Sequence, residues 1–457
     1  MKPLAVLSSL IAAVSLGCVD TPPPTAPALS FTKIASDAGN TCLDVAAANH
    51  RGDKHAPVVL RCAIRAPGLA VLTQGQKGWV DGHNYYLANQ SNAGLDVYDA
   101  DALTFVGRVG GMAGNLPAGG GTAITNGPGP SAIAFSDHKT AWVSDGNSTT
   151  RIVDVKAMQI IGSVNTSIPA CDDGTNHYCG RANEIAYDPE HQLIFVQNPS
   201  PLAVAAPHGA LDTYATFINA RPPYNIVGTI SFPNRRGQEA PVYDMQTHRM
   251  LTAVSGRQVV ATVGGVPTVT ELHHQYVAVI NPEVRPFVVE DSFKIDCTAL
   301  GITVAVTPAN PSGRTFGIND PPNAIGPDQH MVIPGCGRPI IMNAATGEII
   351  SSGITQVGGG NETWYNKGDK NFYTTVGGFV GVIDAKTAQW LQNVDAPGGA
   401  NPAAYAKKNR VFVIVQRSTT AATVCDQFGY QATGCIAVYG HEGKDDADEP
   451  DGDDDDH

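Results

Sequence analysis

One structural unit recurs along this sequence, and the repeat limits the possible fold more than any other feature. Each copy opens with an apolar stretch that ends in a polar turn, and similar copies begin at Ala132, Glu184, Ala240, Asn323, Glu362 and Pro402. A second apolar stretch follows each turn, as in Thr140-Ala-Trp-Val and Leu193-Ile-Phe-Val. Two strands joined by a short polar turn form a β-hairpin. Hairpins that recur along the whole chain indicate a repeat architecture.

Each repeat continues with two more predicted strands. The third strand ends in Asp or Asn, as in Val382-Ile-Asp384, where the side chain can bond to the backbone two residues on and close a turn. A fourth strand follows, as in Trp390-Leu-Gln-Asn-Val. Four antiparallel strands in about 40 to 50 residues are typical of a propeller blade. We therefore predict an all-β fold, a β-propeller with seven four-stranded blades. Six blades remain possible if the first and last repeats share one.

The two ends of the chain are expected to complete the ring together. The last repeat stops after Cys435-Ile-Ala-Val-Tyr-Gly and lacks a fourth strand, so the segment from Phe31 to Leu72 is predicted to supply it. Closure of this kind removes exposed sheet edges. The predicted domains are a signal peptide at 1–18, a ring-completing segment at 19–79, the propeller at 80–443 and a disordered acidic tail at 444–457.

The N-terminal sequence predicts secretion. Lys2 precedes an apolar run from Leu4 to Leu16 that ends in small residues, which is typical of a secretory signal peptide. The end of this run also matches a lipoprotein signal loosely, at Cys18. No later stretch is long and apolar enough for a transmembrane helix, so we expect a chain that is secreted or lies in the secretory-pathway lumen, without a membrane span.

Cysteines and sequons fit this compartment. Removal of Cys18 leaves eight cysteines, and an even number in a secreted chain favours disulfides. We expect local pairs, namely Cys42 with Cys62, Cys171 with Cys179, Cys297 with Cys336, and Cys425 with Cys435. Four N-x-[ST] sequons are predicted glycosylation sites: Asn89, Asn147, Asn165 and Asn361.

The charge pattern argues against a nucleic-acid partner. The formal net charge is −13, and nine acidic residues lie between Asp445 and His457. The clustered Lys and Arg side chains that phosphate contacts require are missing from the sequence. The acidic tail is expected to be a solvated end, with weak calcium chelation as the alternative.

Irregular connections point to one mouth of the propeller channel. The link between second and third strands is enlarged at residues 198–213, 255–274 and 416–434. These links open at the same mouth as the connections between blades, and long structured loops on a repetitive scaffold usually carry function. Covering the end of the channel is the alternative. His208 and His273 lie in or beside these loops and are predicted to bind substrate. Four other histidines are predicted turn residues at the opposite mouth: His138, His191, His248 and His330.

A ring of polar residues is predicted where the inner strands begin. The aligned positions give seven candidate catalytic residues: Asn183, Glu184, Glu239, Asn323, Asn361, Glu362 and Asn401. Carboxylates that converge in a desolvated channel can hold raised pKa values for acid and base chemistry, or bind a hard cation. An equal alternative is that these side chains cap neighbouring turns and tie blades together through water. Trp364 is a candidate substrate-binding residue in an apolar cup, or else a packing residue.

Several segments resemble a known family. Tyr85-Tyr-Leu-Ala, Asn183-Glu-Ile-Ala-Tyr-Asp-Pro and Val382-Ile-Asp-Ala-Lys-Thr look like the secreted YVTN-type β-propeller proteins, over roughly residues 80 to 440. The signal peptide, sequons and paired cysteines make the chain similar to the fungal hetero-Diels–Alderases of tropolone–sesquiterpenoid biosynthesis. No catalytic residue transfers by motif, and a propeller fold hosts many activities.

The narrower resemblance implies a cofactor-free enzyme with an apolar small-molecule substrate. It would join a tropolone o-quinone methide to a humulene-type alkene by holding both in a reactive pose. On this hypothesis amides such as Asn183 and Asn401 polarise the tropolone oxygens, and Glu184 or Glu362 promotes loss of water from a hydroxymethyl precursor. The alternatives are a metal-dependent lactonase or other hydrolase, and a non-catalytic extracellular binding propeller.

Overall fold

The structure is a computed structural model. It describes residues 56–65, 71–114, 129–146, 148–168, 181–198, 213–233, 235, 237–303, 310–316, 325–358, 362–376 and 378–442. The predicted signal peptide, the residues up to 55 and the acidic tail lie outside the described residues. Within the described part the fold is all-β, and its helices are short 3-10 turns such as η5 (Val424–Phe428).

The strands form seven antiparallel blades, which confirms the seven-bladed β-propeller. We number the blades along the chain. Blade 1 contains β2 (Gly75–Asp81), β3 (Asn84–Asn89), β4 (Gly94–Asp99) and β5 (Thr104–Val109). Blade 2 contains β6 (Ile133–Asp137), β7 (Thr140–Asp145), β8 (Thr149–Asp154) and β9 (Gln159–Asn165). Blade 3 contains β10 (Ile185–Asp188), β11 (Leu193–Asn198), β12 (Thr213–Asn219) and β13 (Ile226–Phe232).

Blades 4 and 5 follow with two departures from the repeat. Blade 4 contains β14 (Gln238–Asp244), β15 (Arg249–Val254), β18 (Gln275–Ile280) and β19 (Val289–Ile295). Blade 5 contains β21 (His330–Gly335), β22 (Arg338–Asn343) and β23 (Ile349–Ser351). Blade 4 takes its third strand from β18, because an inserted hairpin separates it from β15. The described part of blade 5 has three strands, and an isolated bridge between Ile325 and Met331 occupies the inner position.

Blades 6 and 7 complete the ring. Blade 6 contains β24 (Thr363–Asn366), β25 (Asn371–Val376), β26 (Phe379–Asp384) and β27 (Gln389–Asp395). Blade 7 contains β28 (Gly399–Tyr405), β29 (Arg410–Val415), β30 (Cys435–His441) and β1 (Val58–Arg65). The N-terminal strand β1 pairs with β30 from Val58 opposite His441 to Arg65 opposite Cys435, which confirms closure by both termini. The innermost strand of blade 1, β2, spans residue 80, where the predicted ring-completing segment meets the predicted propeller.

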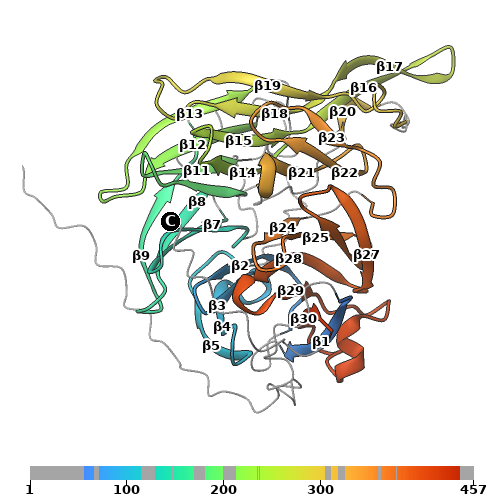
Figure 1. Cartoon of the computed structure of the whole chain (residues 1–457). Coiled ribbons are helices and arrows are strands. Elements are labelled where there is room, and N and C mark those ends of the chain that lie inside the picture. Colours follow the sequence, from blue (N-terminus) through green and yellow to red (C-terminus); the bar gives the residue numbers. More distant parts are fainter. Residues whose placement is uncertain are drawn as a thin grey trace, which may run out of the picture. The chain divides into compact units, whose positions relative to one another are not determined.

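An apolar cluster lies between each pair of neighbouring blades. Seven such clusters occur in the described residues, one for each of the seven interfaces. Between blades 7 and 1, for example, the rings of Tyr85 and Phe412 stack with their centroids 4.7 Å apart. The first strands of neighbouring blades contact one another, so they line the centre while the later strands lie outward (Figure 1). Burial of these clusters is the main favourable term in closing the ring.

The enlarged connection in blade 4 forms a small sheet of its own. Strands β16 (Gly256–Val263) and β17 (Val266–His273) form a hairpin, and β20 (Asn310–Phe316) pairs with the other edge of β16. The hairpin extends beyond the blades in Figure 1. Two irregular segments, one within blade 4 and one between blades 4 and 5, therefore meet in this side sheet.

Two predicted disulfides are confirmed. Cys297 bonds to Cys336, and Cys425 bonds to Cys435. Cys62 is also disulfide-bonded, but Cys42, Cys171 and Cys179 lie outside the described residues.

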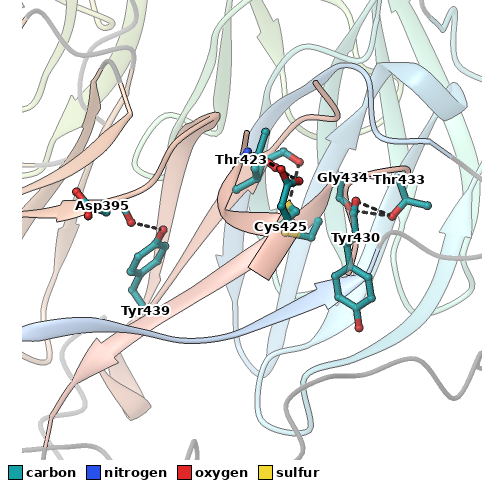
Figure 2. The surroundings of a disulfide bond; sticks show 10 residues. Asp395, Thr423, Cys425, Tyr430, Thr433, Gly434 and Tyr439 are labelled. Carbon is teal, nitrogen blue, oxygen red and sulfur yellow. Dashed lines mark hydrogen bonds between the residues drawn. A yellow bond between two sulfur atoms is a disulfide. The ribbon is translucent and has the colours of Figure 1, made fainter. Parts of the chain in front are cut away.

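Cys425 lies in η5, where the connection between β29 and β30 packs on β1 and β30 (Figure 2). The hydroxyl of Tyr439 donates to the Asp395 carbonyl at 3.1 Å and ties blade 7 to blade 6 (Figure 2). In the part of the chain that the structure describes, no helix has the length and apolar character needed to cross a bilayer.

Candidate active site in the central channel

Three charged side chains from different blades meet inside the propeller. The Lys77 ammonium on β2 donates to a carboxylate oxygen of Glu184 and lies 3.8 Å from Oε1 of Glu362. The exposed fractions of the three side chains are 0%, 5% and 5%. We call Lys77, Glu184 and Glu362 the ionic cluster. It links blades 1, 3 and 6, which are not neighbours in the ring.

Local strand geometry positions this cluster. Glu184 and Glu362 directly precede β10 and β24, and their carbonyls accept from the amides of Gln197 at 2.9 Å and Thr375 at 3.3 Å. Each Glu is thereby held as an extension of its inner strand. The predicted convergence of Glu184 and Glu362 is confirmed by their shared partner, Lys77.

The ionic cluster combines one group that can donate a proton with two that can accept one. One ammonium and two carboxylates carry a net charge of −1 when all are ionised, and an ammonium already occupies the place of a cation. Among the described residues, no group of three or more His, Cys, Asp or Glu side chains is arranged to hold a metal ion. Burial, and then the charges of Glu362 and Asp96, raise the pKa of Tyr85 far above its usual value, so that phenol stays neutral.

The amides of the predicted ring make contacts between neighbouring blades. Asn183 donates from Nδ2 to Oε2 of Glu239 at 3.0 Å, which joins blades 3 and 4. Asn401 donates from Nδ2 to the carbonyl of Gln76, which joins blades 7 and 1. Both asparagines are buried. These contacts fit the alternative interpretation, in which the ring residues tie blades together. Asn323, Asn361 and His208 lie outside the described residues.

An aromatic cavity of about 440 Å³ lies further along the same inner strands. Its lining includes Trp79, Trp364, Tyr365, Tyr405, Lys367 and Lys407. We call it the aromatic cup. The rings of Trp79 and Trp364 meet edge to face, with centroids 5.2 Å apart and planes at 82°. Because side chains alternate along a strand, Trp364 in β24 lies on the same face as Glu362, two residues earlier. The cup is therefore one step along the strand from the ionic cluster.

The cup opens at the hairpin-turn mouth of the channel. Gly82, Lys367 and Lys407 lie in the turns between first and second strands, and both lysines are exposed. The enlarged connections emerge at the other mouth. Trp364 thus lines a cavity, and this cavity faces the opposite mouth from the one predicted for it.

The predicted histidines that the structure describes lie away from the ionic cluster. His138, His191 and His248 occupy the turns between first and second strands, as predicted, and His330 begins β21. Hydrogen bonding to Asp81, 3.0 Å away, raises the pKa of His138. His273 pairs with Glu271 in the side sheet, so the structure places it outside the channel.

Two of the sequons can be placed. Asn89 is fully buried, and its Nδ2 donates to Oδ2 of Asp96 at 2.7 Å. This arrangement leaves no room for a glycan, so the structure does not fit the prediction at Asn89. Asn165 is exposed at the end of β9. Asn147 and Asn361 lie outside the described residues.

Lys77 and Trp79 were not among the residues predicted from the sequence. The inner strand of blade 1 lacks the Asn or Glu that precedes its counterparts, so the repeat alignment passes over it. The available signal was a single charged residue, Lys77, close to a tryptophan in the run Gly75-Gln-Lys-Gly-Trp79. No protein-family model matches the sequence, and a search of curated proteins finds no significant match.

Proposed function

We propose that the central channel is a small-molecule active site, and that the protein joins a tropolone o-quinone methide to a humulene-type sesquiterpene by cofactor-free hetero-Diels–Alder cyclisation. The observation that carries this proposal is the aromatic cup directly beside the ionic cluster. A volume of about 440 Å³ lies in the range of small-molecule sites, which are mostly apolar with a few placed polar groups. The choice of reaction rests on the sequence resemblance.

The cup would act by positioning. Trp79 and Trp364 supply flat apolar surface, against which the diene and the alkene are held together. Orientation of this kind replaces a bimolecular encounter by a reaction between bound partners and can remove several kcal/mol of barrier. The cycloaddition forms one C–C and one C–O bond and transfers no proton.

The ionic cluster would act before that step. In the release of the quinone methide, the tropolone reacts as its anion, so its ring oxygen has no proton to lose. The departing hydroxyl group of the hydroxymethyl arm receives a proton from the Lys77 ammonium and leaves as water, which gives the neutral quinone methide. Glu184 and Glu362 hold the ammonium in place, and a proton from solvent restores Lys77.

A stereochemical assay tests the proposal. The protein is incubated with a hydroxymethyl tropolone precursor and humulene, and the adduct is analysed by chiral chromatography and mass spectrometry. We expect one stereoisomer, formed faster than in buffer, with loss of rate in Trp364→Ala and Glu362→Gln. The control is Trp390→Ala, because Trp390 is 36% exposed on the outer strand β27.

Two results would contradict the proposal. A racemic adduct formed at the rate of the buffer reaction would exclude cyclase activity with these substrates. Activity that is lost on treatment with a chelator and restored by a divalent cation would favour the metal-dependent hydrolase instead.

A further inference from the structure

We infer that the aromatic cup admits a planar aromatic anion through the hairpin-turn mouth, with the ring against Trp79 and Trp364 and the negative charge toward Lys367 and Lys407. This inference deepens the proposed function by naming the charge and entry route of the substrate. It rests on that function only for the claim that the bound molecule is turned over.

The two lysines give the rim of the cup a positive charge, of which the Lys407 part is felt by Asp101 nearby. In the part of the chain that the structure describes, the side chains of Lys367 and Lys407 have no hydrogen-bond or ion-pair partner, and both are exposed beside the cup. They come from equivalent turns of blades 6 and 7. An anion at the rim can therefore meet two ammonium groups that carry no prior salt bridge.

Acidic groups around this mouth already have partners. Asp81 at the end of β2 accepts from Nδ1 of His138 at 3.0 Å. Asp101 lies 2.6 Å from Nδ1 of His83 and accepts the hydroxyl of Tyr405 at 2.9 Å. The charge of these two acids is thus partly balanced by the partners, although Asp101 also interacts electrostatically with Lys407.

The wall of the cup adds no negative charge. Burial, and then the hydrogen bond to Asp101, raise the pKa of Tyr405 far above its usual value. Burial, and then the charge of Asp369, also raise the pKa of Tyr365. Both phenols are therefore neutral at physiological pH. Trp79 and Trp364 are half-buried, so they present ring surface to a ligand while their packing fixes their orientation.

The ionic cluster orients the ligand. Glu362 lies two residues before Trp364 on the same face of its strand, so the carboxylates of the cluster repel an anionic group at the inner end of the cup. A planar aromatic anion is therefore expected to bind with its charged group outward, at the lysines, and its uncharged edge inward.

A binding titration tests this inference without turnover. The probes are 4-nitrobenzoate and its neutral analogue 4-nitrobenzamide, because nitroaromatic rings quench tryptophan fluorescence. Two of the four tryptophans line the cup. We expect both probes to quench the wild-type protein, with about tenfold tighter binding of the anion, an advantage that shrinks as salt is added.

Variants that remove the lysine charges test whether Lys367 and Lys407 cause the preference for the anionic probe. The double variant Lys367→Gln/Lys407→Gln should bind both probes with equal affinity, and Trp364→Phe should lose most of the quenching. Lys139→Gln is the matched control, because Lys139 is exposed in the equivalent turn of blade 2 but does not line the cup. Thermal melts verify that every variant is folded.

The outcomes separate this inference from the proposed function. Equal affinity of the wild type for the two probes, or an undiminished preference in the double variant, would overturn the anion site. Absence of quenching by either probe would overturn the cup as a binding site. Anion-selective binding without cyclisation would leave the inference standing and remove the cyclase. Cyclisation without anion selectivity would do the reverse.

Discussion

Lys77 is the most consequential residue in the channel, because a buried ammonium offsets two buried carboxylates. We predict that Lys77→Met lowers the free energy of unfolding by about 3 to 5 kcal/mol, since Glu184 and Glu362 then lose a buried cationic partner. Urea unfolding followed by circular dichroism measures the change. The exposed Lys139→Met is the control and should lie within about 0.5 kcal/mol of the wild type. A Lys77→Met protein as stable as that control would show that the carboxylates find other compensation.

Asn89 carries a sequon but has no surface for a glycan. We predict that protein from a eukaryotic secretory host has no glycan at Asn89, because its amide is buried against Asp96, and that Asn165 is accessible to modification. Enzymatic deglycosylation in heavy-oxygen water, followed by peptide mass spectrometry, marks each occupied asparagine. An occupied Asn89 in folded protein would mean that the turn after β3 differs from the described structure.

At the scale of single elements, β1 is the strand that completes the ring. Its side chains enter two cores: Cys62 and Ile64 pack toward blade 1, whereas Ala63 packs among residues of blades 6 and 7. We predict that Ala63→Asp destabilises the protein by several kcal/mol, because it buries an unpaired charge in this core. Arg65→Asp is the control in the same strand, since Arg65 is only half-buried. Thermal unfolding compares the two variants, and equal melting temperatures would show that the cores do not require β1.

The sequence predicted elements well wherever the repeat was regular. The hairpins of blades 2, 3, 4, 6 and 7 follow from alternating apolar strands and their polar turns, because both signals are local. The side sheet was not predictable in this way. Strands β16 and β20 pair although Val260 and Asn310 lie 50 residues apart, and no local pattern encodes that pairing. The inner position of blade 5 likewise has only one described bridge, at Ile325, where the sequence predicted a strand.

At the scale of the whole molecule, the repeat predicts how far along its strand a residue lies. It does not predict which residue of another blade that residue contacts across the channel. The alignment placed Glu184 and Glu362 at one level, and the structure shows both beside Lys77. Lys77 and Glu184 are separated by 107 positions, and their contact depends on the number of blades and their closure. The aromatic cup was missed for a related reason. Trp364 has the pattern of a packing residue, and only the assembled ring shows the cavity that it lines with Trp79.

The last prediction asks whether the ionic cluster serves stability or chemistry. Replacement of a buried ion cluster by apolar side chains of similar size is often neutral or stabilising, because the cost of burying the charges disappears together with their attraction. We predict that Lys77→Met/Glu184→Leu/Glu362→Leu restores the free energy of unfolding to within about 1 to 2 kcal/mol of the wild type, well above that of Lys77→Met alone. Cyclisation from the hydroxymethyl precursor should be lost in the triple variant, because no ammonium is left to protonate the departing hydroxyl group.

A quinone methide generated chemically in the assay bypasses that dehydration. The triple variant should then recover cyclisation, because the cup is intact and the cycloaddition needs no proton transfer. Urea unfolding of the triple variant and of Lys77→Met gives two free energies. The chiral assay of the triple variant on the hydroxymethyl precursor and on the quinone methide gives two rates of cyclisation. A triple variant that is stable and fully active on the hydroxymethyl precursor would assign the cluster a structural role only. One that unfolds more readily than Lys77→Met would show that the fold depends on the charges themselves.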